Sequence, residues 1–593
     1  YPYSSITPGA EGNPYLVKSP EDLAWFAYQV NVEGRTSLCG ELRSNINLYG
    51  SFYNGENAYN PDDSSAGLEK ALRWVPIGSD VDGKRYTGTF NGNYHTITAM
   101  RASDTDKQGL FGTLGDNAAI RKTGILDSQI NVSSAIGGGI AGYVKGIGVE
   151  ITECGNKGSL SVTGSYIGSC VGMMDGTTGD LILDGCYNEG NISVSAGAVV
   201  GGIIGGVPGT TAGQVTIRNC MNSGTVTGNS VVGGIIAVSN PGAITVTGCW
   251  NAGTVSAFMD SSSAGSIIGM YSGSADDIRD CLVDETHKYG DIGNCLTVKP
   301  EALGTWGAAW RLNGGSFKQT TGLSWTYDKD SAYPVLSTTG LPPAESWEQV
   351  GEAMEYGLIK DIEKPSGNGS TTPYQIQNPE QLAWLAYKVN TDNTNYRTSE
   401  AVLTSNIDLA GLGYTKESSV DSDFSNCLKW VPIGNDPSNT SMKETLSYRG
   451  IFDGGNCEIK NLYVIGGVYY TGLFGGANSA TIRNVKIISG SVTGTNRVGA
   501  ILGASNGGTV LIENCYNAAD IKAVLQNGFV ACNTGGIVGA GFNASARLYV
   551  KNCVNKGAVS GYREGGGIIG TTHQGAIEIQ NCYNLGTVTQ IGT

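Results

Sequence analysis

Aromatic and other large side chains recur at one position of a repeat, where they could stack on a sugar ring or on a protein partner. Each follows a repeated cysteine, and successive cysteines are about 30 residues apart. If the cysteine points into a core, the alternation of a β-strand directs the next side chain outward. The alternative is that these residues cover a turn or pack beneath a neighbouring loop. The candidate binding residues are Tyr187, Met221 and Trp250 in the first half of the chain and Tyr516, Val554 and Tyr583 in the second.

Carboxylates that could cleave a polysaccharide are few. Such chemistry requires paired carboxylates, or an acid beside a Lys or Arg, within one groove. Glu150, Glu153 and Asp184 lie near expected turns, and scattered carboxylates on an acidic surface are usually solvated. His95 has no histidine counterpart in the second half of the chain, so an ordinary strand position is the simpler interpretation. We identify no catalytic residues, and the sequence leans against an enzyme.

Metal-binding patterns are also weak. Asp80 and Asp82 precede Gly83 and could ligate calcium, but a solvated turn is the simpler interpretation. The three histidines are scattered and no Cys-x-x-Cys pair occurs, so the sequence lacks a usual zinc motif. We expect neither a metal nor another cofactor. The repeated cysteines are interpreted as small buried apolar residues rather than as a disulfide framework.

Two sequence periods show how these residues would be positioned. A period of about 360 residues relates 14–25 to 373–384 and 74–78 to 430–434, so the chain is a duplication. Within each copy, a unit of about 31 residues contains a Gly-Gly-Ile type segment, a strand ending in Cys-x-Asn and a Gly-Thr-Val type strand. One unit cannot bury itself, but stacked units pair strand on strand about 4.8 Å apart. We predict an all-β fold, a right-handed parallel β-helix (β-solenoid) with two tandem modules.

An asparagine lies two positions after each repeated cysteine. Asparagine tolerates left-handed backbone at turns, and its side chains can stack in ladders from coil to coil. We therefore assign these residues a structural role: Asn156, Asn188, Asn222, Asn251, Asn517, Asn555 and Asn584.

Each module is expected to begin with a short capping helix. Ser19 or Asn378 is the predicted N-cap, and a proline follows at the first helical position. An apolar helix face would cover the open end of the solenoid. We expect the second module to be truncated at its C-terminal end, because no closing segment follows it. The expected boundaries are 1–345 for the first module (capping helix 19–31, coils about 75–296, closing helix about 300–313), 346–371 for a linker rich in Gly, Pro and Ser, and 372–593 for the second module.

Composition excludes some classes of partner. The formal net charge of −15 disfavours nucleic acid, because phosphate binding requires clustered Lys and Arg. The sequence contains no run of 18 apolar residues, so we expect no membrane insertion of this segment. With only 15% charged residues the chain can bury a large core, and its 90 glycines suit a backbone that turns often.

Several segments together resemble the GLUG-motif proteins of bacterial cell surfaces. They include Gly-Leu-Phe-Gly at 109–112 and 472–475, Trp-Val-Pro-Ile-Gly at 74–78 and 430–434, and the Cys-Tyr-Asn-x-Gly type coils. Such modules are similar to the non-catalytic β-helical parts of Gram-positive adhesins and of immunoglobulin A1 metallopeptidases. The peptidase chemistry of the latter requires His-Glu-x-x-His, which this sequence does not contain.

The sequence therefore predicts a rigid, non-catalytic scaffold or adhesin module at the bacterial surface. We expect it to be extracellular, to belong to a longer chain and to bind a glycan or a host or cell-surface protein. Two alternatives stay open. One is a carbohydrate-active β-helix enzyme, a polysaccharide lyase or glycoside hydrolase, and the other is an accessory domain of a larger secreted peptidase.

Overall fold

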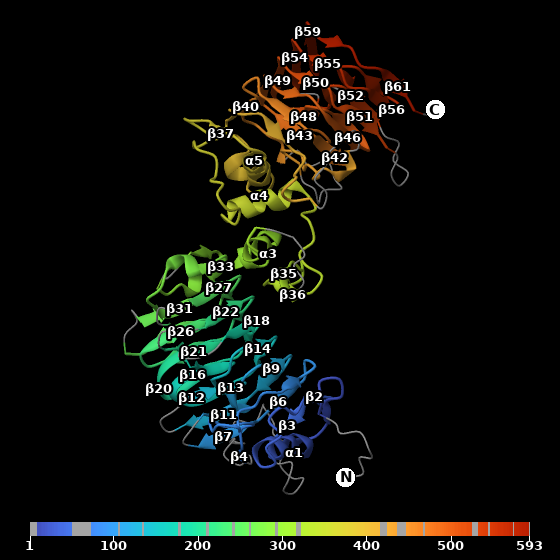
Figure 1. The fold of residues 1–593 in the computed structure, drawn as a ribbon. Helices are drawn as coiled ribbons and strands as arrows, with labels where there is room; N and C mark the ends of the chain where they lie inside the picture. The colour runs from blue at the N-terminus through green and yellow to red at the C-terminus, as the bar shows by residue number, and fades with distance from the viewer. Residues whose placement is uncertain are drawn as a thin grey trace. The chain divides into compact units, whose positions relative to one another are not determined.

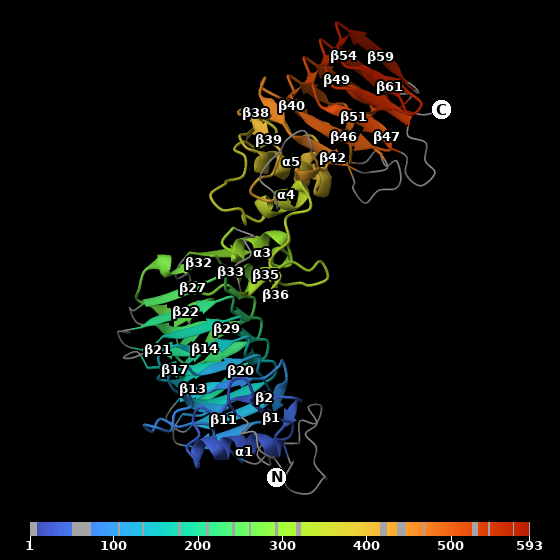
Figure 2. The same ribbon diagram turned by 45° about the vertical axis from the view of Figure 1, so that its right-hand side comes forward.

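The chain folds into two compact units, seen in the computed structural model in Figures 1 and 2. The first unit extends to Leu341 and the second begins at Pro342, except that Thr305–Gly307 belongs to the second. Within the described part of the chain, no helix is long and apolar enough to cross a membrane. The structure describes residues 9–591 apart from 50–72, 105–106, 133–135, 176–179, 209–212, 240–242, 260–262, 291–293, 316–321, 416–423, 436–445, 466–468, 525–531, 544–545 and 573–574.

The first unit is a stack of parallel strands. One nine-stranded sheet runs from β1 (Tyr15–Val17) to β32 (Ile278–Arg279), and ten- and six-stranded sheets form further faces. Its strands pair in parallel with those of neighbouring coils. The prediction of an all-β parallel β-solenoid is confirmed. A second nine-stranded sheet contains β3 (Ile46–Asn47), β6 (Thr96–Thr98), β10 (Gly124–Leu126), β15 (Gly155–Asn156), β19 (Tyr187–Asn188), β23 (Met221–Asn222), β28 (Trp250–Asn251), β33 (Cys281–Asp284) and β34 (Cys295–Val298).

The second unit has the same parallel organisation. A seven-stranded sheet runs from β37 (Tyr374–Ile376) to β59 (Ala576–Gln580), and five-, four- and three-stranded sheets accompany it. The sheet that corresponds to the second nine-stranded sheet of the first unit contains β39 (Ile407–Asp408), β41 (Glu458–Lys460), β45 (Lys486–Ile487), β50 (Tyr516–Asn517), β55 (Val554–Asn555) and β60 (Tyr583–Asn584).

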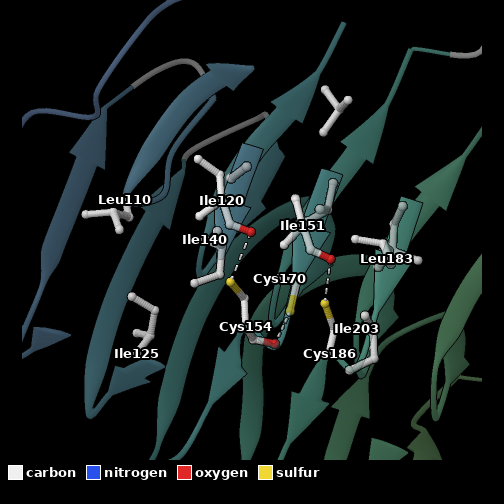
Figure 3. Close-up of a cluster of buried hydrophobic side chains, with 14 of the residues drawn as sticks. Leu110, Ile120, Ile125, Ile140, Ile151, Cys154, Cys170, Leu183, Cys186 and Ile203 are labelled. Atoms are coloured by element: carbon white, nitrogen blue, oxygen red, sulfur yellow. Dashed lines mark hydrogen bonds between the residues drawn. The ribbon is translucent and has the colours of Figure 1, made fainter. Parts of the chain in front are cut away.

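Apolar side chains from successive coils fill the solenoid interior (Figure 3). Repeated cysteines are part of this core, and Cys154 and Cys186 are fully buried. Their thiols donate to the carbonyl oxygens of Ile120, at 3.6 Å, and Ile151, at 3.3 Å. Burial raises the pKa of the Cys154 thiol well above its ordinary value. The predicted role of these cysteines as buried core residues is confirmed.

A helix lies at the N-terminal end of the first solenoid (Figure 1). This helix, α1 (Pro20–Asn31), begins where the Ser19 side chain accepts a hydrogen bond from the Asp22 backbone N–H at 3.2 Å. Its buried face includes Phe26, whose ring packs edge-on against Phe90 of the first coils. In the second unit, α5 (Pro379–Thr391) begins in the same way, with Asn378 as the N-cap.

Two predicted segments differ from the structure. The helix expected over about 300–313 is divided into α2 (Pro300–Leu303) and α3 (Trp306–Leu312), because Gly304 ends the first piece. The linker expected over 346–371 begins instead with α4 (Trp347–Glu355), which packs on α5. Glu355 at the end of α4 accepts a hydrogen bond from Trp384 Nε1 at 2.7 Å, and a short α6 (Asn393–Tyr396) follows α5.

The predicted asparagine ladder is present inside the first solenoid. Asn156 donates to Asn188 at 3.0 Å, Asn188 to Asn222 at 2.6 Å, and Asn222 to Asn251 at 2.6 Å, all through side-chain amides. All four residues are fully buried. They do not adopt the left-handed backbone that the sequence suggested. That conformation belongs to the residue just before each repeated cysteine, for example Asn219 at φ 54°.

Candidate functional site

The strand register aligns the candidate residues of the first unit. Tyr187 pairs with Met221, and Met221 pairs with Trp250, so the three side chains form one row across β19, β23 and β28. The cysteine before each of them is fully buried. Strand alternation therefore places the row on the outer side of the sheet, as the sequence predicts.

The second unit forms the corresponding row. Tyr516 pairs with Val554, and Val554 pairs with Tyr583. Tyr516 and Val554 are half-buried, whereas Tyr583 is 65% exposed. The structure therefore brings each row together within its own unit.

The row of the first unit forms part of a pocket of about 620 Å³. Five of its lining side chains are aromatic, and two are carboxylates. The thirteen lining residues are Tyr94, Glu153, Gly185, Tyr187, Glu189, Met221, Ser223, Trp250, Trp325, Tyr333, Pro334, Val335 and Leu336.

One wall of the pocket is an antiparallel hairpin, β35 (Ser324–Thr326) and β36 (Val335–Ser337). Trp325 attaches this hairpin to the solenoid, because its Nε1 donates to the carbonyl oxygen of Gly248 at 2.6 Å. Nearby, Asn219 Nδ2 donates to the Leu323 carbonyl oxygen at 3.2 Å. A Cβ on Gly185 would lie 3.1 Å from Leu336 Cδ1, so the small residue permits this close packing. The sequence did not indicate that the hairpin packs beside the row, because the contacting residues are far apart along the chain.

Trp250 is not the exposed stacking surface that the sequence suggested. Its side chain is only 2% exposed, and the Tyr333 ring stacks on it with centroids 4.9 Å apart and an interplanar angle of 17°. The Trp325 ring lies on it as well, at 6.1 Å. The alternative interpretation, that the residue packs beneath a neighbouring segment, is therefore correct for Trp250. Trp250 Nε1 is buried and has no hydrogen-bond partner in the described part of the chain.

Tyr187 is the half-buried aromatic residue at one end of the row. Its ring extends over two glycines of the preceding coils. A Cβ on Gly155 would lie 2.8 Å from Tyr187 Cδ2, and one on Gly124 would lie 3.1 Å from its hydroxyl oxygen. At Gly155 the added Cβ would also lie 1.9 Å from the Tyr187 carbonyl oxygen, so a larger residue there would displace the backbone of this strand as well as the ring. Burial raises the pKa of Tyr187, so its hydroxyl stays protonated and able to donate at neutral pH.

Tyr94 and Glu153 form the other side of the pocket. The Tyr94 hydroxyl donates to Glu153 Oε1 at 2.7 Å, and Lys122 Nζ lies 4.7 Å from the Tyr94 ring centroid. Burial, and then the hydrogen bond to Glu153, raise the pKa of Tyr94. The sequence did not single out Tyr94 as a site residue. Asn93 and Tyr94 both have positive φ, 50° and 63°, and the Tyr94 side chain is exposed.

The other candidate carboxylates have separate partners. Glu150 pairs with Arg121 at 3.3 Å, and Asp184 pairs with Arg218 at 2.8 Å. Of the three carboxylates considered, only Glu153 lines the pocket. His95 Nδ1 lies 3.2 Å from Asn45 Oδ1 at an exposed position.

Asp80 is surrounded by cationic side chains rather than placed to hold calcium. Lys107, Arg85 and Lys145 approach its carboxylate at 2.9, 3.4 and 3.4 Å. Burial raises the pKa of Asp80, but hydrogen bonds and charge from the two lysines outweigh it and leave the pKa below its ordinary value. The solvated turn expected there is therefore an ion-pair cluster. Over the described residues, no group of three or more His, Cys, Asp or Glu is arranged to hold a metal ion.

Comparison with known proteins gives limited matches. No family model matches the chain, so its resemblance to GLUG-motif proteins stays a prediction. A segment of the chain is 28% identical over 161 residues to Halomucin of Haloquadratum walsbyi. The matched segment covers 26% of this chain and 2% of that protein. A crystal structure from Bacteroides ovatus, provisionally described as an immunoglobulin A1 protease, overlaps 56% of this chain and 94% of its own, with a TM-score of 0.31 and 17% identity.

Proposed function

We propose that this protein is a rigid, non-catalytic, extracellular scaffold that binds a glycan in the pocket of its first unit. The observation that carries the proposal is that five aromatic side chains line one pocket of about 620 Å³, and that three of them, Tyr94, Tyr187 and Tyr333, are at least partly exposed. Aromatic rings stack on the apolar faces of sugars, and a few polar groups at the rim then fix the sugar's orientation.

Stiffness follows from the strand pairing. Parallel ladders join each coil to the next, and the buried asparagine ladder adds side-chain hydrogen bonds along the same direction. Buried, fully paired amides hold the coils in register. Such a solenoid places the pocket on rigid elements, which lowers the ordering cost of binding.

The enzymatic alternative has less support. Hydrolysis or lyase chemistry would require two carboxylates, or an acid and a base, that face one substrate bond. In the pocket, Glu153 is engaged by Tyr94 and Lys122, and Glu189 is exposed at the rim. The local sequence match to a protein named Halomucin supports an extracellular setting. If the test below shows no glycan binding, a protein ligand or an accessory role beside a peptidase becomes the alternative.

The test combines binding with product analysis. The purified chain would be applied to an array of glycans and mucins, and the same polysaccharides would be incubated with it and analysed by mass spectrometry. We expect saturable binding without released oligosaccharides. Tyr187→Ala should raise the Kd about tenfold, because truncation of a stacking ring typically costs at least 1 kcal/mol.

The matched control is Tyr516→Ala. Tyr516 has the same place in the repeat and is also half-buried, but it does not line the pocket. Its replacement should leave the Kd unchanged. Release of oligosaccharides would overturn the non-catalytic proposal, and equal loss of binding in both variants would place the site elsewhere.

A further inference from the structure

The residues that line the pocket carry negative charge, although two lysines, Lys122 and Lys157, lie close to its rings. Glu153 and Glu189 contribute two carboxylates, while none of the described residues that line it is Lys, Arg or His. Glu189 is exposed, and no hydrogen bond or ion pair of its side chain occurs among the described residues. Its carboxylate is therefore free to accept hydrogen bonds from a ligand and to repel a negative one.

The positions where a ligand cation would stack are already taken. Lys122 Nζ lies 4.7 Å from the centroid of the Tyr94 ring, and Lys157 Nζ lies 5.5 Å from that of Tyr187. Lys122 also approaches Glu153 Oε2 at 3.9 Å. The chain thus supplies its own cations to both rings, so a ligand ammonium group would gain little from stacking on them.

Uncharged polar groups also line the pocket. The Tyr187 hydroxyl and Ser223 can each donate and accept hydrogen bonds. Hydroxyl groups of a sugar match this set, because each can donate to the Glu189 carboxylate and accept from a protein hydroxyl.

We infer that the pocket takes a neutral, hydroxyl-rich sugar and discriminates against acidic sugars, whether they carry a carboxylate or a sulfate. This inference rests on the proposed glycan-binding function of the same pocket. Tyr94, Tyr187 and Tyr333 would supply the stacking surface. Glu189 would accept sugar hydroxyls and repel negative charge, whereas Lys122 already offsets the charge of Glu153.

The experiment measures affinity for matched probes with the full chain. The probes are lacto-N-tetraose and its sialylated form, and dextran and dextran sulfate, each titrated at about 20 mM and at about 500 mM NaCl. We expect the acidic member of each pair to bind at least about tenfold more weakly at low salt, with a smaller ratio at high salt because the repulsion is screened.

Two variants separate charge selection from general effects. Glu189→Gln keeps the shape of the side chain and removes its charge, so it should reduce the ratio between neutral and acidic affinities several-fold. Glu11→Gln is the matched control, because Glu11 is exposed and does not line the pocket, and it should leave the ratio unchanged.

The outcomes distinguish the inference from the proposed function. Tyr187-dependent binding in which the acidic probe binds as tightly as the neutral one would overturn the inference and leave the proposed function standing. If no probe or array glycan shows binding that Tyr187→Ala weakens, the proposed function fails, and the inference fails with it.

Discussion

Replacement of Asn188 by alanine tests whether the buried amide ladder stabilises the solenoid. Asn188 is fully buried, accepts a hydrogen bond from Asn156 Nδ2 at 3.0 Å and donates one to Asn222 Oδ1 at 2.6 Å. The substitution would leave one donor and one acceptor buried without partners. Each such group costs about 1–3 kcal/mol, so we expect a loss of about 2–6 kcal/mol in the free energy of unfolding.

The matched control is Asn191→Ala. Asn191 is exposed, and within the described part of the chain its side chain accepts one hydrogen bond, from the Thr225 backbone N–H at 3.2 Å. Water can replace that bond, so the expected loss is below about 1 kcal/mol. Urea denaturation followed by circular dichroism would measure both variants. Because coils of a solenoid can unfold separately, amide hydrogen exchange in the strands next to Asn188 would locate the loss.

A double substitution sharpens this test. After Asn188→Ala, Asn222 has already lost its donor, so adding Asn222→Ala should cost less than it does in the wild-type chain. Equal and small losses for Asn188→Ala and Asn191→Ala, or strict additivity of the double substitution, would refute the argument that the ladder is energetically coupled.

Two further predictions concern backbone packing and pH. Gly202→Ala should prevent folding or lower the melting temperature severely, because its Cβ would lie 1.9 Å from the Gly234 carbonyl oxygen, whereas Gly12→Ala, with no atom within 4 Å, should be tolerated in the same thermal melt. The pKa of Glu355 is raised by burial but lowered more strongly by the Trp384 hydrogen bond and by Lys364 and Lys388, so that it lies below its ordinary value. The ionised Glu355 side chain therefore stabilises the fold above the unfolded pKa of about 4.3, and this stabilisation is lost as pH falls through the lower folded value. Glu355→Gln should weaken this loss of stability in acid, measured by urea denaturation at a series of pH values. An unchanged pH dependence would contradict the stabilising role of the Glu355 carboxylate.

Much of the fold was predictable from sequence because it depends on repetition. The spacing of the cysteines fixes which strand positions stack on one another, and the register of Tyr187, Met221 and Trp250 follows that spacing. Helix starts were also predictable, since Ser19 and its following proline act within one turn. These are local or periodic signals, and a single chain displays them directly.

The sequence pattern gave wrong predictions of exposure and secondary structure where a distant segment packs against the residues concerned. Trp250 occupies the predicted outward position, yet it is covered because Tyr333 returns across it from a hairpin beyond the last coils. The Gly-, Pro- and Ser-rich composition of 346–371 concealed α4, whose burial depends on its packing against α5.

By itself, the sequence determined the parallel solenoid, its inward cysteines, its asparagine ladder and the rows of side chains that follow the cysteines. All of these follow from a short repeat that must stack to bury its apolar residues. Only the tertiary structure decided that one row lines a pocket, that Tyr333 covers Trp250, and that Tyr94 and Glu153 complete the site. The physical reason is that these contacts join residues from different coils and a distant hairpin, and no periodic pattern specifies which side chains meet there.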